Sequence, residues 1–470
     1  MKRMRWFDYL TINIYWLAQS MASASLTPIV LPFLVASFVP PEVKGTYYGR
    51  LRVIGLAIAM MIQPMAGLFS DRSTLQWGRR RPYIALGTLL NVAFLTALGI
   101  VTNYWTLLAV CIFLQFSSNI AHGALQGLIP DLVPEDQRGR ASGVKSIMEL
   151  LPSLLAMGIG PLMDKGYLWA VIGILMGFRL ICMLITLVGV HEEPLRERPT
   201  APLAGPLLQI VALTLIFVTV TQGAERLVAL VGKFAGTTAT QLAIVGLAGL
   251  AAMAGSVILG VYFSARVGLG RDAQKHSSFI WWVVNRLLFL AAVGSVQSFA
   301  QYFLSDVLRV ENAATVTSIL MGIVAIFLVT SAPISGWLSD RWGRRQLVMA
   351  SGLIAAAGTF LLLFSFNIPM VLVSGCIIGI GAGTFMATNW ALGTDLVPPE
   401  EAGRYLGISN LAGAGAGIVG AGIGGPMADF FNVYRKGLGY IVIFAIYGVL
   451  ALLSTVTLLK VRPTFGKERA

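Results

Sequence analysis

Charged side chains are scarce in this sequence of 470 residues, in which Asp, Glu, Lys and Arg together make up 12%. A soluble domain carries about twice that share, roughly 25%. Hydrophobic residues reach 56% and the mean hydropathy is +0.78, so the chain cannot cover a surface that faces water. The composition therefore excludes a soluble globular protein and predicts an integral membrane protein in contact with the lipid bilayer.

Acidic residues are fewer than basic ones, 21 against 34, which leaves a formal net charge of +13. A nucleic-acid-binding protein gathers such a surplus into one patch. Here the basic residues stand in short connections between apolar runs, as the positive-inside rule requires of cytoplasmic loops. We therefore expect no nucleic-acid partner. We expect a multi-pass protein of the cell membrane with both termini on the cytoplasmic side.

Cysteine is rare, and residues arranged for catalysis are absent. Cys111, Cys182 and Cys376 are scattered through apolar runs, which excludes a disulfide framework and a Cys/His metal site. The sequence has no glycine-rich phosphate loop and no Ser, His and Asp arrangement typical of a nucleophilic enzyme. We therefore predict that the chain is not an enzyme and needs no cofactor or metal. Its energy must come from an ion or solute gradient, unless a separate ATPase supplies it.

Long apolar runs are what the sequence does have. A membrane-spanning helix needs about 20 predominantly apolar residues, and fourteen stretches meet this requirement. They lie at 9–36, 47–70, 83–102, 105–130, 141–163, 168–190, 206–225, 239–264, 278–304, 313–337, 346–366, 369–394, 405–429 and 438–460. The first run exceeds the core of a signal peptide, so we interpret it as an uncleaved span.

The spans group as six, two and six. We expect an all-α membrane protein with a six-helix bundle at 1–190, a linker with two additional transmembrane helices at 191–276, and a second six-helix bundle at 277–470. The middle pair has an alternative interpretation, in which one span is followed by an amphipathic helix on the membrane surface.

Three motifs occur twice, in the same order and about 265 residues apart. They are a charged hinge at 67–72 and 77–81 that returns at 336–345, Asp-Leu-Val-Pro at 131–134 and 395–398, and Gly-Pro-x-x-Asp at 160–164 and 425–429. Recurrence in a constant order indicates a chain built from two similar halves. Such construction is typical of transporters that work by alternating access.

The two hinges resemble the signature that the major facilitator superfamily carries between the second and third spans of each half. The resemblance covers the chain apart from the middle pair. It implies the major facilitator fold, in which two pseudo-symmetric six-helix bundles rock about a central cavity. Residues 63–72, the insertion 73–76 and residues 78–82 are similar to the sucrose-transporter-like, glycoside–cation symporter branch, as is Leu26-Thr27-Pro28.

The chain departs from that branch in two places. Sucrose-type symporters have an Asp in the fourth span that takes part in proton coupling, whereas Gln115, which cannot ionise, stands at the aligned position. The two central spans are foreign to the branch and resemble those of 14-span drug exporters. The usual mechanism of sucrose–proton symport therefore does not carry over.

Charged residues of the hinges and of the Asp-Leu-Val-Pro motif are candidates for gating. A carboxylate can meet the positive N-terminus of a neighbouring helix, and an arginine can meet a carboxylate or a helix C-terminus. If such contacts form only when the cytoplasmic side is closed, they favour the outward-open state. For the arginines, simple anchoring is an equal alternative. The gating candidates are Asp71, Arg72, Gly78, Arg79, Arg80, Asp131, Arg140, Asp340, Arg341, Arg344, Arg345, Asp395 and Arg404.

The fourth span carries a polar stripe. Gln115, Asn119, His122 and Gln126 fall at i, i+4, i+7 and i+11, which places them on one face of a helix. Polar residues on a membrane helix face either a partner helix or a water-filled cavity. We favour a cavity in which they bind a polar solute, because the superfamily places the corresponding helix there.

Glu149 and His122 are candidates for proton coupling, because a buried carboxylate or a histidine can exchange a proton as the cavity changes sides. At about 1.5 Å per residue both lie roughly 12–14 Å above the cytoplasmic boundary. Glu149 has no acidic counterpart in the second half. The alternative is a static ion pair with Lys145, Arg179 or Arg286.

The second half supplies further candidates for substrate binding. They are Asn285, Arg286, Gln297, Gln301, Asn389 and Trp390. Arg286 is deep enough in its span to need a partner, either a protein carboxylate or an anionic group of the substrate. Arg179 in the sixth span raises the same choice. Trp390 either stacks on a sugar ring or packs as an ordinary aromatic residue.

We therefore expect a monomeric secondary active transporter for a small organic solute, with a coupling proton or cation. The resemblance favours a sugar- or glycoside-like substrate. One alternative is an exporter of hydrophobic or amphipathic compounds, favoured by the middle pair, and another is a transporter of organic anions, favoured by the two deep arginines. A non-transporting membrane assembly factor on the same fold is a further alternative, and a collapsed apolar centre would favour it.

Overall fold

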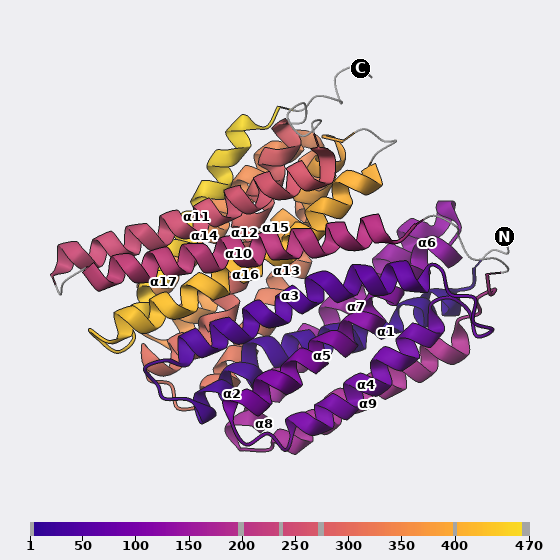
Figure 1. Cartoon of the computed structure of the whole chain (residues 1–470), viewed down its shortest axis with the longest axis horizontal. Helices are drawn as coiled ribbons and strands as arrows, with labels where there is room; N and C mark the ends of the chain where they lie inside the picture. The colour runs from indigo at the N-terminus through magenta and orange to yellow at the C-terminus, as the bar shows by residue number, and fades with distance from the viewer. Residues whose placement is uncertain (1–3, 196–201, 235–237, 271–276, 398–401, 463–470) are drawn as a thin grey trace.

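The computed structural model describes residues 4–195, 202–234, 238–270, 277–397 and 402–462, which form helices and short connections without a strand (Figure 1). Thirteen of the described helices are long and apolar enough to cross a membrane. Helix α16, with 31 residues, has the length of a fourteenth. The predicted all-α membrane fold is therefore confirmed, and the exact division into domains stays a prediction.

The first half begins with a span that is interrupted by a π-helical segment. Pro28 lies in this segment, and proline lacks the N–H that a regular helical hydrogen bond needs. The elements are α1 (Trp6–Ser25), η1 (Leu26–Val30), α2 (Leu31–Phe38), α3 (Lys44–Ser70), α4 (Arg81–Leu98), α5 (Tyr104–Leu125), α6 (Leu128–Leu132), η2 (Glu135–Gln137), α7 (Arg138–Leu155), η3 (Ala156–Gly158), α8 (Ile159–Asp164) and α9 (Leu168–Gly189).

The second half repeats this order in longer, less interrupted helices. Its elements are α12 (Ser277–Asp306), α13 (Ala313–Trp342), α14 (Arg344–Leu363), α15 (Ile368–Thr394), α16 (Ala402–Asn432), α17 (Leu438–Thr457) and η6 (Leu458–Lys460). Side-chain caps start corresponding helices in both halves. Asn103 accepts the Thr106 N–H at the start of α5, and Asn367 accepts the Met370 N–H at the start of α15.

The middle pair consists of two full-length apolar helices, α10 (Ala204–Phe234) and α11 (Ala239–Leu269). They pack against each other and along α3 and α16, so they lie beside the seam between the halves (Figure 1). The alternative of one span followed by a surface helix is therefore excluded for the described residues.

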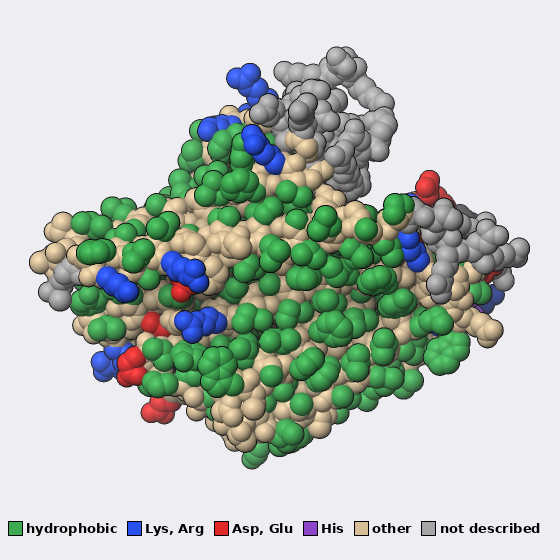
Figure 2. All heavy atoms as spheres, viewed as in Figure 1, with side chains coloured by type: hydrophobic (Ala, Val, Ile, Leu, Met, Phe, Trp, Pro, Cys, Tyr) green, Lys and Arg blue, Asp and Glu red, His purple; other side chains and the backbone are tan. Residues whose placement is uncertain are grey.

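Alternating helix directions give the molecule two distinct ends. We call the end that carries Asp71 and Gly343 the hinge end, and the end where α3 and α13 begin the far end. Figure 2 shows hydrophobic side chains across the middle of the visible face, with Lys, Arg, Asp and Glu gathered towards its margins. An apolar band between charged ends is the surface that a bilayer requires.

Candidate functional site

A polar cavity of about 660 Å³ lies at the seam between the halves. Helices α1, α3, α5, α7 and α9 supply most of its wall, while Gln297 of α12 and Ala414 of α16 come from the second half. Its volume falls within the range of about 300–1,000 Å³ that is typical of small-molecule sites. The collapsed apolar centre expected of an assembly factor is therefore not what the described residues form.

All four residues of the predicted stripe on α5, namely Gln115, Asn119, His122 and Gln126, line this cavity. Asn119 Nδ2 donates to the side-chain oxygen of Gln115 at 3.2 Å. His122 Nε2 lies 3.5 Å from the amide nitrogen of Gln63 on α3 and 3.5 Å from that of Gln126. The stripe thus offers amide and imidazole groups, which both donate and accept hydrogen bonds, to a solute in the cavity.

Glu149 also lines the cavity, and its partner is Lys145 on the preceding turn of α7. Lys145 Nζ lies 3.5 Å from Glu149 Oε1, and about a third of each side chain is exposed, 31% and 35%. The same ammonium group lies 4.0 Å from the centre of the Trp16 ring. Of the three ion pairs considered from the sequence, the structure contains the one with Lys145.

Arg179 is 2% exposed, yet the partners of its guanidinium group are neutral. It donates to the Tyr15 hydroxyl at 3.3 Å, to Gln19 Oε1 at 3.3 Å and to Ser118 Oγ at 3.1 Å. Its Nε has no hydrogen-bond partner, and no carboxylate of the described residues lies within ion-pair distance. A buried cation with neutral partners leaves its positive charge uncompensated.

Arg52 of α3 has a similar environment in the cavity wall. Its Nη1 donates to Thr27 Oγ1 at 3.2 Å, its Nε has no partner, and no carboxylate pairs with it in the described part of the chain. The predicted span began at residue 47, which made Arg52 a residue of the span end. Helix α3 begins at Lys44, so Arg52 lies about two turns inside it.

These groups make the cavity electropositive. Arg52, Lys145 and Arg179 are the cations of its described lining, and Glu149 is the one carboxylate. Because Lys145 already pairs with Glu149, the two arginines remain without a negative counterpart. Sequence reasoning gave weight to the amide-rich stripe and missed Arg52. A more accurate start of α3, the second predicted span, would have revealed it.

Asn285 and Asn389, predicted to bind substrate, lie in the interior of the second half instead. Asn389 Nδ2 donates to Asn285 Oδ1 at 3.1 Å, and Asn285 Nδ2 donates to the Ser454 carbonyl at 2.8 Å. Both side chains are buried, with exposures of 0% and 1%. They join α12, α15 and α17, which is the role of polar contacts between membrane helices. They are therefore not part of the cavity wall.

Gln297 and Gln301 lie on one face of α12 but have different surroundings. Gln297 lines the central cavity, as predicted. Gln301, with its amide oriented to donate, bonds the carbonyls of Pro28 and Ile29 at 3.1 and 2.9 Å. These carbonyls belong to the π-helical segment η1, so Gln301 links the two halves rather than facing the cavity.

Arg286 is held by aromatic rings. Its guanidinium carbon lies 4.8 Å from the centre of the Trp390 ring and 5.8 Å from that of Trp282. Neither Arg286 nor Trp390 belongs to the described lining of the central cavity. These cation–π contacts are the partners of Arg286 among the described residues, although its Nε, like those of Arg52 and Arg179, has no hydrogen-bond partner there.

Arg80 is the centre of the first hinge. Its Nε lies 2.8 Å from Asp131 Oδ2, its Nη2 pairs with Asp71, and its Nη1 donates to Ser70 Oγ at 2.5 Å. Arg79 also pairs with Asp131, at 2.6 Å. These contacts join α3, α4 and α6, so they stabilise the hinge end within the first half.

Gly78 shapes the same hinge for two reasons. Its φ of +106° is a conformation that favours glycine, and a side chain there would collide with Glu192. The Arg80 N–H donates to Glu192 Oε2 at 2.7 Å. Burial raises the pKa of the Glu192 carboxyl above its usual value, although this hydrogen bond acts in the opposite direction.

The second hinge contains a counterpart of the Arg80 pair. Arg344 Nη1 lies 2.6 Å from Asp395 Oδ1 and 3.1 Å from the Ala391 carbonyl oxygen. Arg341 lies over the Trp337 ring, 4.1 Å from its centre. Each hinge therefore ties its own half together.

The other gating candidates have fewer contacts. Asp340 and Arg345 face a surface pocket, and Asp340 has no ion partner in the described part of the chain. Arg72 and Arg140 likewise lack an ion partner among the described residues. Arg404 lies in α16, and its side chain lies outside the described residues.

The polar contacts that the described residues make between the halves lie towards the far end. Lys44 Nζ pairs with Asp306 Oδ2 at 2.7 Å, and the Tyr302 hydroxyl donates to the Pro32 carbonyl at 2.9 Å. Asp429 accepts the N–H groups of Gly45 and Thr46 at 3.0 and 2.6 Å. A carboxylate at this place meets the free N–H groups and the positive end of α3.

Asp164 makes the equivalent contact from the first half to the second. It accepts the N–H groups of Ala314 and Thr315 at 3.3 and 2.7 Å and the Thr315 hydroxyl at 2.6 Å, at the start of α13. We call Asp164 and Asp429, with the helix starts that they bind, the reciprocal caps. They join the two halves at the far end.

The repeated Gly-Pro-x-x-Asp motif explains this symmetry. Gly160 and Gly425 leave no room for a Cβ, because the backbone oxygens of Ala314 and Gly45 lie against them. The glycine of each motif lets the halves approach, and the aspartate about one helical turn later binds the partner helix. The sequence revealed the motif but not its partner.

Two related helical halves that meet at one end and enclose a polar cavity have the architecture of a multi-pass membrane transporter. The chain belongs to the Major Facilitator Superfamily, whose family model matches residues 17–304 and 285–470. Solved structures with the same fold include a mutant of the nucleoside transporter NupG, with a TM-score of 0.67, 13% identity and coverage of 96% of this chain and 99% of that one. A mutant of the peptide transporter POT gives 0.68, 14%, 99% and 97%.

Similar curated proteins match over shorter stretches. The minor myo-inositol transporter IolF of Bacillus subtilis is 32% identical over 95 residues, 20% of this chain and 22% of the relative. The class H tetracycline resistance protein of Pasteurella multocida is 28% identical over 155 residues, 33% and 38%. Human solute carrier family 45 member 4 is 30% identical over 152 residues, 29% and 19%. The matches thus span about a fifth to two fifths of each of these relatives.

Proposed function

We propose that this chain is a secondary active transporter that carries a small organic solute through the central cavity by alternating access. The observation that supports this most is the polar cavity, which is closed towards one end by contacts between the halves. The charged groups of the hinges bind only within their own half. Exchanging far-end contacts for hinge-end contacts would move the opening from one side to the other.

The charge distribution predicts how the chain is oriented in the membrane. By the positive-inside rule the hinge end and both termini face the cytoplasm. The structure then corresponds to an inward-facing transporter of the cell membrane. The charged hinge residues would close the cytoplasmic side in the outward-facing state, in which the reciprocal caps are separated.

Proton coupling is proposed at Glu149, with His122 in the same wall. Protonation of Glu149 would release Lys145 from its ion pair and add one positive charge to the cavity. An anionic solute would then bind more tightly, and by thermodynamic reciprocity it would also favour uptake of the proton. This linkage makes symport of a proton with an anion a simple outcome of the geometry.

Two substrate classes fit parts of the cavity. A neutral sugar- or glycoside-like solute, as in the sucrose-transporter-like branch, fits the amide stripe of α5, and inositol transporters stand among the similar proteins. An organic anion fits the two arginines that have no carboxylate partner, Arg52 and Arg179.

Solute counterflow in proteoliposomes tests the transport function. The purified chain would be reconstituted and loaded with myo-inositol, methyl β-glucoside or 4-phenylbutyrate, and exchange of the labelled compound would be measured. We expect saturable exchange of at least one compound, reduced at least about tenfold by Arg179→Gln, which removes hydrogen bonds from a charged group. Exchange of no compound by folded, reconstituted protein would contradict the proposal.

A further inference from the structure

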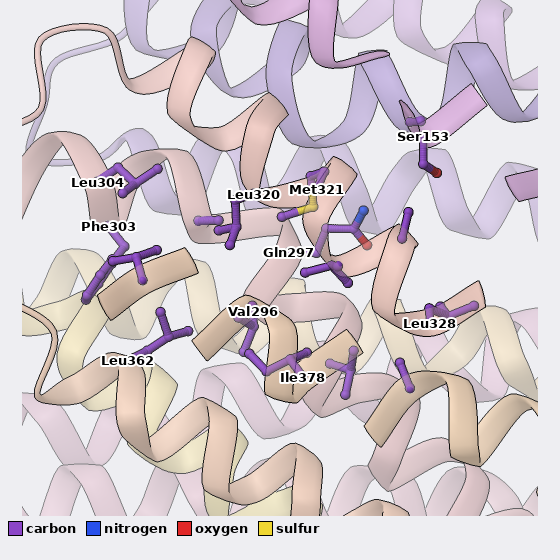
Figure 3. Close-up of a pocket in the computed structure, with 18 of the residues that line it drawn as sticks. Ser153, Val296, Gln297, Phe303, Leu304, Leu320, Met321, Leu328, Leu362 and Ile378 are labelled. Atoms are coloured by element: carbon purple, nitrogen blue, oxygen red, sulfur yellow. The ribbon is translucent and has the colours of Figure 1, made fainter. Parts of the chain in front are cut away.

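A second cavity, of about 160 Å³, adjoins the central one and is lined mostly by the second half, with Ala24, Leu150 and Ser153 from the first. Its lining is apolar apart from Ser153 and Gln297, and both of these residues also line the central cavity. Figure 3 shows side chains such as Phe303, Leu320 and Ile378 around this space, with Gln297 near the middle of the view and Ser153 towards the upper right. We call this space the apolar chamber.

The apolar chamber has the size of a small ring. An apolar cavity of about 150 Å³ in another protein stays dry and binds benzene. Filling such a space with an apolar group removes that group from water and restores dispersion contacts to the lining. The chamber therefore favours a compact apolar group, and Ser153 and Gln297 are the polar side chains that its described lining offers to a sugar hydroxyl.

The chamber and the arginines lie at similar depth. Counted from the far end of their helices, Arg52 lies about two turns deep, Gln297 about two and a half, and Arg179 about three. Ala325, in the chamber wall, lies about three turns deep in α13. Because Ala24, Ser153 and Gln297 line both spaces, one molecule can occupy the polar cavity and the chamber together.

We propose that the substrate is an amphipathic organic anion, a carboxylate that carries a compact apolar group about the size of a benzene ring. Arg52 and Arg179 supply the positive charge for the carboxylate, Ser153 and Gln297 stand at the junction, and the apolar chamber takes the ring. A cation would be repelled by the arginines, and a free sugar would leave the chamber empty. This inference rests on the proposed transporter function.

Three probes separate the two parts of the recognition. Binding of 4-phenylbutyrate, butyrate and 4-phenylbutyramide to the purified full chain would be measured by isothermal titration calorimetry. We expect 4-phenylbutyrate to bind at least about tenfold more tightly than butyrate, because the ring is buried. We also expect it to bind at least about tenfold more tightly than the neutral amide, which lacks the charge-assisted hydrogen bonds.

Variants test which residues cause the preference for the acid over the amide and the preference for the ring. Arg52→Gln and Arg179→Gln should each reduce the preference for the acid over the amide at least about fivefold while keeping the preference for the ring. Ala325→Phe, which fills the chamber, should do the reverse. Arg286→Gln is the matched control, because Arg286 is an arginine outside the cavity lining. Each variant is judged by a ratio of two affinities, which a partly misfolded sample does not change.

Equal binding of acid, amide and butyrate would overturn the inference, as would unchanged ratios in both arginine variants and in Ala325→Phe. If methyl β-glucoside or myo-inositol is exchanged by proteoliposomes while the phenyl compounds do not bind, the anion inference fails and the transport function stands. If no probe binds or is exchanged, both fail.

Discussion

The two halves of this protein agree at their ends and differ at their centre. At the far end Asp164 binds the start of α13, and Asp429 binds the start of α3 in the same way. At the hinge end an arginine of each half pairs with the Asp of its own Asp-Leu-Val-Pro motif. At the centre the first half presents amides and charges, whereas the second half presents apolar side chains.

This difference separates two tasks. The contacts that occur in both halves either join the halves or stabilise one hinge. We therefore assign them to the conformational change of alternating access. The residues that differ between the halves form the polar wall and the apolar wall of the proposed solute site. Substitutions in one or both of the repeated contacts, and in the cavity residues that have no counterpart in the other half, should differ in the size of their effect.

The largest effect is expected where the halves approach most closely. In Gly425→Ala or Gly160→Ala the added methyl group meets a backbone oxygen of the other half, so far-end closure should weaken on the order of 100-fold. The measurement is the rate at which an impermeant maleimide, added at the far end, labels Ser23→Cys in the cavity wall. Gly294→Ala, where a methyl group has open space, is the control. Equal labelling rates in the three variants would count against the contact.

Loss of the reciprocal caps should have the next largest effect. A helix cap contributes about 1 kcal/mol, so Asp164→Ala and Asp429→Ala should each raise the same labelling rate about fivefold. The two caps share no partner residue and act on different helices, so their effects should add and the double variant should show about a thirtyfold increase. The account predicts equal effects of the two single variants, and a large effect of one with none of the other would show that the symmetry is not functional.

Substitution of Glu149 tests the part of the cavity wall that has no counterpart in the second half. Glu149→Gln removes the titratable carboxyl from the cavity wall and should lower accumulation driven by a pH gradient at least about tenfold, while counterflow persists. Glu225→Gln, which changes an acid of α10 outside the cavity lining, is the control. Undiminished accumulation by Glu149→Gln would remove this residue from the coupling mechanism.

The smallest effect is expected at the hinges. Asp71 pairs with Arg80 but is half exposed, and such ion pairs contribute less than about 1 kcal/mol. Asp71→Asn should therefore change the labelling rate by about fivefold or less. Asp340→Asn should also change it by about fivefold or less, and because Asp340 has no ion partner among the described residues, any change would report a hinge contact of the outward-facing state. No change in either variant would count against a gating role of the two hinge carboxylates.

Local spacing predicted the parts of the site that lie on one helix. The stripe on α5 follows from the helical repeat, and Glu149 follows from its place in an apolar run, so both were found in the cavity wall. The membrane fold and the thirteen apolar helices found among the described residues follow from apolar length alone.

Contacts between distant helices could not be predicted in the same way. Asn285 and Asn389 look like cavity residues until α12, α15 and α17 are packed together. The motif containing Asp164 was recognised twice in the sequence, but its partner lies about 150 residues away across the seam. Arg52 was missed because a start three residues too late moved it from the interior of a span to its end.

The central claim is that the halves exchange closure at the far end for closure at the hinge end. Distances between spin labels measured by double electron–electron resonance test it directly, with one pair at Glu42 and Glu311 on the far end and one at Gln76 and Gln346 on the hinges, all exposed positions. The account predicts that Gly425→Ala lengthens the far-end distance and shortens the hinge-end distance in the same population. A longer far-end distance with an unchanged hinge-end distance, or no change in either, would contradict it.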